Sequence, residues 1–274
     1  ILVFTSSIYL YWNRSFTIES SALFFTLSSL SIYSTIRNRS VQALEQHHRF
    51  YWLATLYLIT TSLGLLIKAT TALPALLLMA IDCLAQLMPT TKPSEPRKSN
   101  RRDYFLLAGC MLAAFMLMHA WTQHADTLKQ LSPIGKTMTS EALSGWNFGT
   151  PEQRLSGDLW QEVLITRMLT PLGAIPSLLL LSWAFAITSR EPEKRLFMAA
   201  CLWMALGPLF IFTNLHVVHN YYQAANQIYL LMAIAAAASC ILAARRLGSI
   251  RWLAIGLSGL IVAGSLMEFW QGTH

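Results

Sequence analysis

Apolar runs about 20 residues long recur from one end of this chain to the other, and they constrain the fold more than any other feature. A run of that length crosses the ~30 Å hydrocarbon core of a bilayer as an α-helix. Only 12% of the 274 residues are charged, about half of the ~25% found in soluble globular domains. The sequence therefore predicts an all-α, polytopic transmembrane helical bundle and excludes a soluble domain.

The runs predict about nine spans, which together form a single transmembrane domain over residues 1–274. We place the spans at 1–12, 20–36, 50–67, 69–88, 104–121, 169–188, 196–213, 226–244 and 252–270. Little more than Lys68 separates the third span from the fourth, so these two are expected to form a tight hairpin. Pro74 falls in the first turns of the second arm, where its missing N–H is tolerated. The chain opens at Ile1 inside an apolar run, with no signal-peptide pattern, and we interpret it as N-terminally truncated.

Basic residues divide the connecting segments into two sets, which predicts the orientation. The richer set consists of Arg37, Arg39, Arg49, Lys92, Arg97, Lys98, Arg101, Arg102, Arg190, Lys194, Arg195, Arg245, Arg246 and Arg251. By the positive-inside rule these loops are cytoplasmic, as in an integral protein of the cell's inner or plasma membrane. The net charge of +7 is then a topology signal, so we expect membrane lipids and no nucleic acid as partners.

A long loop at about 122–168 is predicted on the outer face, periplasmic or extracellular. Its second half reads SGWNFGTPEQRLSGDLWQEVLITR. Apolar residues at helical spacing over Leu159–Leu169 predict a short amphipathic helix along the membrane interface, and a plain anchor is the simplest interpretation. The guanidinium groups of Arg154 and Arg167 match phosphate oxygens in shape, although surface arginines are common. Trp146 and Trp160 fit either a sugar or lipid headgroups.

Two charged residues lie at the predicted outer ends of spans. Glu19 follows a short polar segment, where it could ligate a divalent cation, hold an acceptor hydroxyl, or satisfy free N–H groups at a helix start. Lys68 is a single cation between two apolar helices, beside hydroxyl residues that begin the second helix. It suits a phosphate site, and equally a lysine that reaches water and fixes the turn.

The stretch 213–223, TNLHVVHNYYQ, is the most polar and aromatic boundary in the sequence. An interfacial aromatic belt would explain Tyr221 and Tyr222, but not the histidines and amides around them. We therefore expect His219 and the two tyrosines to bind substrate through phosphate or sugar oxygens. His216 is a candidate metal ligand together with Glu19, and a divalent metal ion is the only cofactor we consider.

These motifs together resemble the membrane glycosyltransferases of the GT-C class. The relevant features are the segment that ends in Glu19, the hairpin LLIKATTALPALLL around Lys68, and the late HNYYQ segment. A narrower resemblance is to bacterial relatives of dolichyl-phosphate-mannose protein mannosyltransferases and of the lipid A aminoarabinose transferase. It implies sugar transfer from a polyprenyl-phosphate carrier to a lipid, glycan or protein acceptor on the outer face. It also assigns Lys68, His219, Tyr221 and Tyr222 to substrate binding.

The family's pattern is not matched throughout. A proline often follows the tyrosine pair in the family, whereas this chain continues with Gln223–Gln227. The resemblance also implies a catalytic carboxylate in the first outer loop, which we expect upstream of Ile1, so this chain alone is expected to be inactive. Two other functions stay open: a secondary transporter or flippase, and a non-enzymatic scaffold for which the outer loop is a docking surface.

Overall fold

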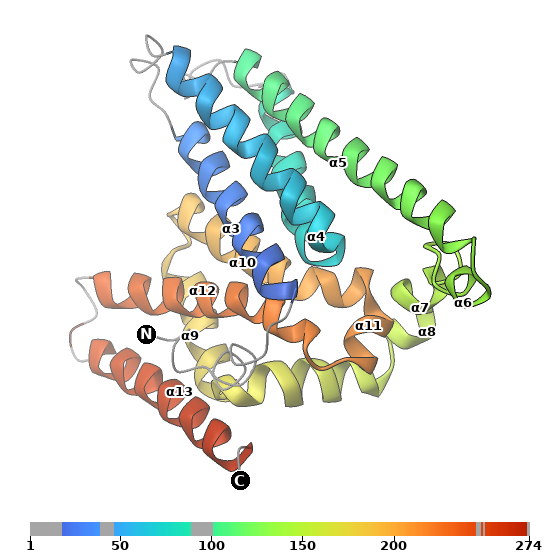
Figure 1. The fold of residues 1–274 in the computed structure, drawn as a ribbon. Helices are drawn as coiled ribbons and strands as arrows, with labels where there is room; N and C mark the ends of the chain where they lie inside the picture. Colours follow the sequence, from blue (N-terminus) through green and yellow to red (C-terminus); the bar gives the residue numbers. More distant parts are fainter. Residues whose placement is uncertain (1–17, 39–46, 89–100, 245–247, 249, 273–274) are drawn as a thin grey trace. The chain divides into compact units, whose positions relative to one another are not determined.

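The computed structural model describes residues 18–38, 47–88, 101–244, 248 and 250–272. All regular elements in these ranges are helices, which confirms the all-α prediction for the described part of the chain. The described residues divide into two compact units, 18–143 and 144–272 (Figure 1). The predicted span at 1–12 and the basic loops at 39–46 and 89–100 lie outside the described residues.

The first unit is built from three long helices and one short one. They are α3 (Ile18–Arg37), α4 (His47–Leu87), α5 (Arg101–Lys129) and α6 (Pro133–Lys136). The backbone of α4 is extended at Lys68, with φ −158° and ψ 94°, and the helix folds back on itself at this point (Figure 1). The Tyr57 hydroxyl in one arm donates to the Met79 sulfur in the other at 3.5 Å. The two arms therefore form the hairpin that the sequence predicts.

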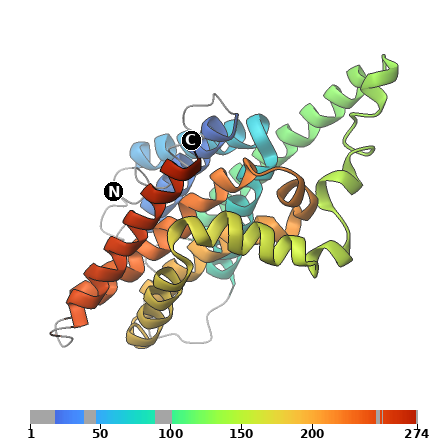
Figure 2. The ribbon, with the colours of Figure 1, turned by 90° about the horizontal axis from the view of Figure 1, so that it is seen from below.

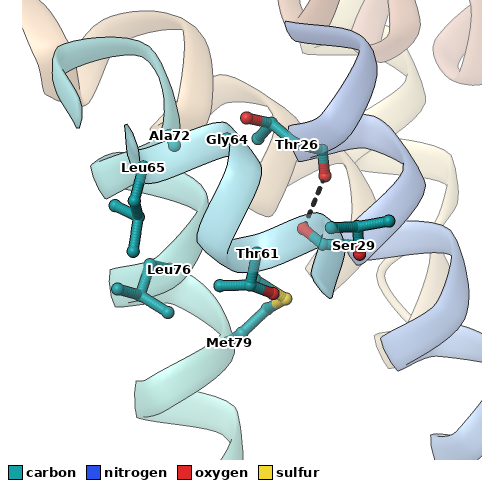
Figure 3. A pocket seen from close by; sticks show the side chains of 9 residues that line it. Thr26, Ser29, Thr61, Gly64, Leu65, Ala72, Leu76 and Met79 are labelled. Atoms are coloured by element: carbon teal, nitrogen blue, oxygen red, sulfur yellow. Dashed lines mark hydrogen bonds between the residues drawn. The ribbon is translucent and has the colours of Figure 1, made fainter. Parts of the chain in front are cut away.

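The arms of α4 and helix α3 pack closely beside this break. A Cβ on Gly64 would lie 3.3 Å from the Thr26 hydroxyl oxygen and 3.5 Å from the Cβ of Ala72. A small cavity about the size of one water molecule lies alongside, lined by hydroxyl groups of Thr26, Ser29 and Thr61 and by apolar side chains (Figure 3). The three helix segments thus approach closely at Gly64, and a large side chain there would push them apart.

The opposite end of α3 carries a polar cluster. Asp82 Oδ2 accepts a hydrogen bond from the Tyr33 hydroxyl at 2.9 Å and pairs with Arg37 Nε at 3.0 Å. At the same end Arg102 donates to the Tyr51 hydroxyl at 3.1 Å. The basic residues at the start of α5 and the end of α3 thus share one end of this unit, away from Lys68, as their predicted common side requires.

The second unit is arranged around α12, which packs against α10 and α9, while α13 packs against α9. Its elements in chain order are α7 (Ser144–Phe148), α8 (Pro151–Arg154), η2 (Asp158–Leu169), η3 (Thr170–Leu172), α9 (Ala174–Ile187), α10 (Pro192–Ile211), α11 (Thr213–Val218), α12 (Tyr222–Ala243) and α13 (Ile250–Gly272). Leu230, Leu231 and Ile234 of α12 are at most 2% exposed, so an apolar core surrounds this helix.

The segment predicted as an amphipathic α-helix is a π-helix, η2. Its buried residues Leu159, Val163 and Met168 are four and five residues apart, a spacing that matches the wider turn of an i→i+5 helix. After η3, Gly173 adopts a left-handed conformation with φ 62°, and α9 leaves at 85° to the preceding segment (Figure 2). A helix that lies in a membrane interface before a span would turn by about this angle, and the interfacial position itself stays a prediction.

The predicted number of nine spans is not confirmed. Among the described residues, five helices are long and apolar enough to cross a membrane, and the bent pair around Gly173 would make a sixth. The folded-back α4 counts once in that number, whereas the apolar runs predict two separate spans there. Helix α9 has only 14 residues, because the left-handed turn at Gly173 starts it later than the predicted span. In contrast, α5 has 29 residues, about 43 Å, and extends past the predicted end at 121.

Candidate functional site

Lys68 and Glu19 form an ion pair at one end of the first unit. They are 49 residues apart in sequence, and their side chains are 10% and 6% exposed. The extended backbone at Lys68 places the ammonium at the apex of the α4 hairpin, and Glu19 stands in the first turn of α3. The structure thus brings together two residues that the sequence picked out separately.

The hydroxyl of Thr70 lies just beyond the apex. Other threonines in these helices, such as Thr26 and Thr60, donate to the carbonyl four residues earlier. For Thr70 that carbonyl belongs to Leu66, on the other arm and across the break. Its Oγ1 atom is buried and has no hydrogen-bond partner among the described residues. The break therefore leaves one unused hydroxyl two residues from the ammonium.

The aromatic residues of the 213–223 segment form a second cluster, in the other unit. Tyr221 and Tyr222 are stacked with ring centroids 4.8 Å apart, and His219 lies 5.2 Å and 5.8 Å from them. Trp146 of α7 meets the edge of the His219 ring at 6.3 Å and is 48% exposed. The four rings form an open aromatic surface, which we call the HYY cluster (Trp146, His219, Tyr221 and Tyr222).

Asn214 fastens α7 to α11 beneath this surface. Its side chain donates to the Trp146 carbonyl at 2.7 Å and accepts from Gln153 at 2.8 Å. Gln153 also closes a capping box with Thr150 at the start of α8. A hydrogen bond from the Thr150 side chain holds the pKa of the exposed Glu152 carboxyl below its usual value. The polar stretch before α12 therefore fixes the position of Trp146, a contact that sequence spacing could not reveal.

His216 is buried beneath the aromatic rings and held by amides. Its Nε2 atom lies 3.3 Å from Asn226, and Gln223 donates to its carbonyl at 2.8 Å. Gln227 donates to the Met168 carbonyl at 3.2 Å. These two glutamines, one turn apart on α12, satisfy carbonyls near the ends of α11 and η2, where regular helix pairing stops.

Both outer-loop arginines are bonded to backbone carbonyls. Arg154 donates to the carbonyls of Phe210 and Phe148 at 2.9 and 3.0 Å. Arg167 donates to the carbonyls of His216 and Val217 at 3.2 and 3.1 Å, and to the Glu162 carboxylate at 3.1 Å. These contacts favour a bracing role for the two guanidinium groups over the predicted phosphate binding.

The predicted metal ligands Glu19 and His216 fall in different units. Glu19 is paired with Lys68, and His216 is packed among amides. Within the described ranges, His, Cys, Asp and Glu side chains form no group of three or more that could hold an ion. The divalent metal stays a prediction from sequence.

Comparisons with known proteins gave no match to any family model, any curated protein or any solved structure. The interpretation of the site therefore depends on its own residues.

Proposed function

We propose that this protein is a membrane glycosyltransferase that moves a sugar from a polyprenyl-phosphate carrier to a lipid, glycan or protein acceptor on the non-cytoplasmic face. The observation that carries the proposal is the meeting of Lys68 with Glu19 at the helix break. Burial of a lysine at the end of an apolar hairpin is energetically unfavourable, and such a residue often has a function. The phosphate of a lipid carrier, held at the membrane boundary, is a suitable partner for it.

The HYY cluster supports the sugar part of the proposal. The C–H face of a sugar ring packs against aromatic rings, while its hydroxyls bond to imidazole nitrogens and tyrosine hydroxyls. Neighbouring rings of the cluster have centroids 4.8–6.3 Å apart, and Asn214 anchors Trp146. A platform of this kind holds one face of a sugar and leaves the other open to attack.

In the proposed reaction, a carboxylate takes the proton of the acceptor hydroxyl as that oxygen attacks the sugar's anomeric carbon. The bond from this carbon to the phosphate oxygen breaks with inversion, and the lipid phosphate leaves with its charge balanced by Lys68. The resemblance assigns His219 and the tyrosines to substrate binding, and their rings suit sugar oxygens. Glu19 is the counterion of Lys68 in the resting protein.

The test is transfer of radiolabelled sugar from a panel of polyprenyl-phosphate donors in membranes that carry the full-length gene product. Loss of one preorganised charge at a leaving group lowers kcat by about 10²–10³-fold. We therefore expect the kcat of Lys68→Ala to fall by about that factor, and the kcat of His219→Ala to fall by less. His124→Ala is the matched control, because His124 lies on α5 outside both clusters. Full activity of both site variants at equal expression would refute the assignment.

A transporter or flippase is the second candidate, and the bent pair around Gly173 favours it. Broken helices of this kind line the substrate paths of many transporters, and the two segments meet at 85°. Reconstituted vesicles separate the two functions: a flippase moves a labelled lipid phosphate across the bilayer without sugar transfer, and a transferase forms a product. A scaffold does neither and tolerates Lys68→Ala.

A further inference from the structure

The Glu19–Lys68 pair raises a question about how Lys68 could meet an anionic substrate. The ammonium is 10% exposed and its charge is already balanced by a carboxylate. A second anion added to this pair would be repelled by Glu19, and the site would then carry an excess negative charge in poorly hydrated surroundings. An incoming phosphate must therefore take the place of the carboxylate.

The local structure allows this replacement. Glu19 stands in the first turn of α3, where the helix dipole stabilises a carboxylate that has left its partner. The buried Thr70 hydroxyl, unused among the described residues, supplies a donor for a phosphate oxygen two residues from Lys68. The phosphate arrives and the carboxylate moves aside, so an anion faces Lys68 throughout.

We propose that Lys68 binds a lipid phosphate by anion exchange: Glu19 is the resting counterion, and the phosphate displaces it and accepts a hydrogen bond from Thr70. This inference rests on the proposed function for the identity of the anion. Glu19 then has a regulatory role, because it keeps the buried lysine neutralised in the empty site and sets the affinity for phosphate. The permanent structural salt bridge is the competing explanation.

Equilibrium binding of a polyprenyl monophosphate to the purified protein in detergent distinguishes these explanations. Glu19→Gln removes the competing anion. We therefore expect the Kd of this variant for the polyprenyl monophosphate to fall about tenfold, which corresponds to about 1.4 kcal/mol. Thr70→Val should raise Kd severalfold, and the double variant K68M/E19Q should lose binding while keeping a neutral, volume-matched pair. Asp82→Asn is the matched control, because it removes a carboxylate from a basic partner at the other end of the same helices. Its Kd should not change.

Equal or weaker binding by Glu19→Gln than by the native protein would overturn anion exchange while leaving the proposed function intact. Absence of both binding and transfer in the native protein would instead remove the proposed function. In that case acylation of the Lys68 amine, followed by mass spectrometry with inorganic phosphate present or absent, decides the exchange. If the Lys68 amine of Glu19→Gln is labelled faster than that of the native protein, and phosphate slows this labelling, anion exchange is supported. Equal labelling rates in Glu19→Gln and the native protein refute it.

Discussion

Replacement of Lys68 by methionine tests the energetic meaning of the buried pair. The substitution keeps the length of the side chain but leaves the Glu19 carboxylate, 6% exposed, without its cation. Removal of one partner from a buried ion pair costs about 3–5 kcal/mol, because a charge stays buried and uncompensated. When Glu19 is also changed to glutamine, no charge remains, and we expect the cost to fall to within about 1 kcal/mol of the native protein.

Thermal unfolding in detergent, followed by tryptophan fluorescence, measures the difference. A change of 1 kcal/mol shifts the Tm of a chain of this size by roughly 2 °C, so Lys68→Met should lower the Tm by about 6–10 °C. The double variant should recover most of this loss. Lys136→Met is the control, because this lysine is exposed, and its Tm should be unchanged. If the single and double variants unfold at the same temperature, the carboxylate is not held by Lys68 and the reasoning fails.

Three further substitutions test the packing that surrounds the two clusters. Gly64→Leu forces the helix segments of the first unit apart and should lower the free energy of unfolding by about 1–3 kcal/mol. The same change at Gly109, where a side chain meets open space, should not destabilise the protein. Gly173→Ala puts a side chain at φ 62° and should lower the free energy of unfolding by about 1–2 kcal/mol. Gly256→Ala is the control within a helix, and equal Tm values in the two variants would refute the role of the turn. Arg167→Ala removes the hydrogen-bond donors of two carbonyls and a carboxylate. It should therefore speed proteolysis after residue 212 in a limited-digestion time course, and an unchanged digestion pattern would argue against a bracing role for Arg167.

Much of the fold follows from the sequence because apolar length and helical hydrogen bonding are local properties. A run of 20 apolar residues in a bilayer usually forms an α-helix. The structure has helices where such runs predict them, around residues 104–121, 196–213, 226–244 and 252–270. The hairpin at Lys68 was predictable for the same reason, since one polar residue between two apolar runs leaves room for little more than a turn. Hydropathy alone could not detect that the span predicted at 169–188 is interrupted at Gly173, so that α9 starts later than predicted.

The tertiary structure decided which side chains meet. Sequence analysis proposed Glu19 for a metal or an acceptor and Lys68 for a phosphate, but nothing local shows that a residue 49 positions away will neutralise the lysine. It considered Arg154 and Arg167 for phosphate because a guanidinium fits phosphate. Their carbonyl partners depend on tertiary packing, since Arg154 binds carbonyls of α7 and α10 and Arg167 binds carbonyls of α11. The π-helix at 158–169 also escaped prediction, since its i→i+5 pattern differs little from an α-helical pattern over 12 residues.

The sequence by itself thus determined the helical membrane character, the hairpin and the residue types available for chemistry, because these depend on composition and on neighbours along the chain. Only the tertiary structure decided that Lys68 is paired, and that the Thr70 hydroxyl has no partner within the described part of the chain. It also decided that Trp146 joins the histidine and tyrosines of the HYY cluster. Each of these depends on contacts between segments far apart in sequence. Their geometry is fixed by helix breaks and close packing, which hydrophobic patterns do not encode.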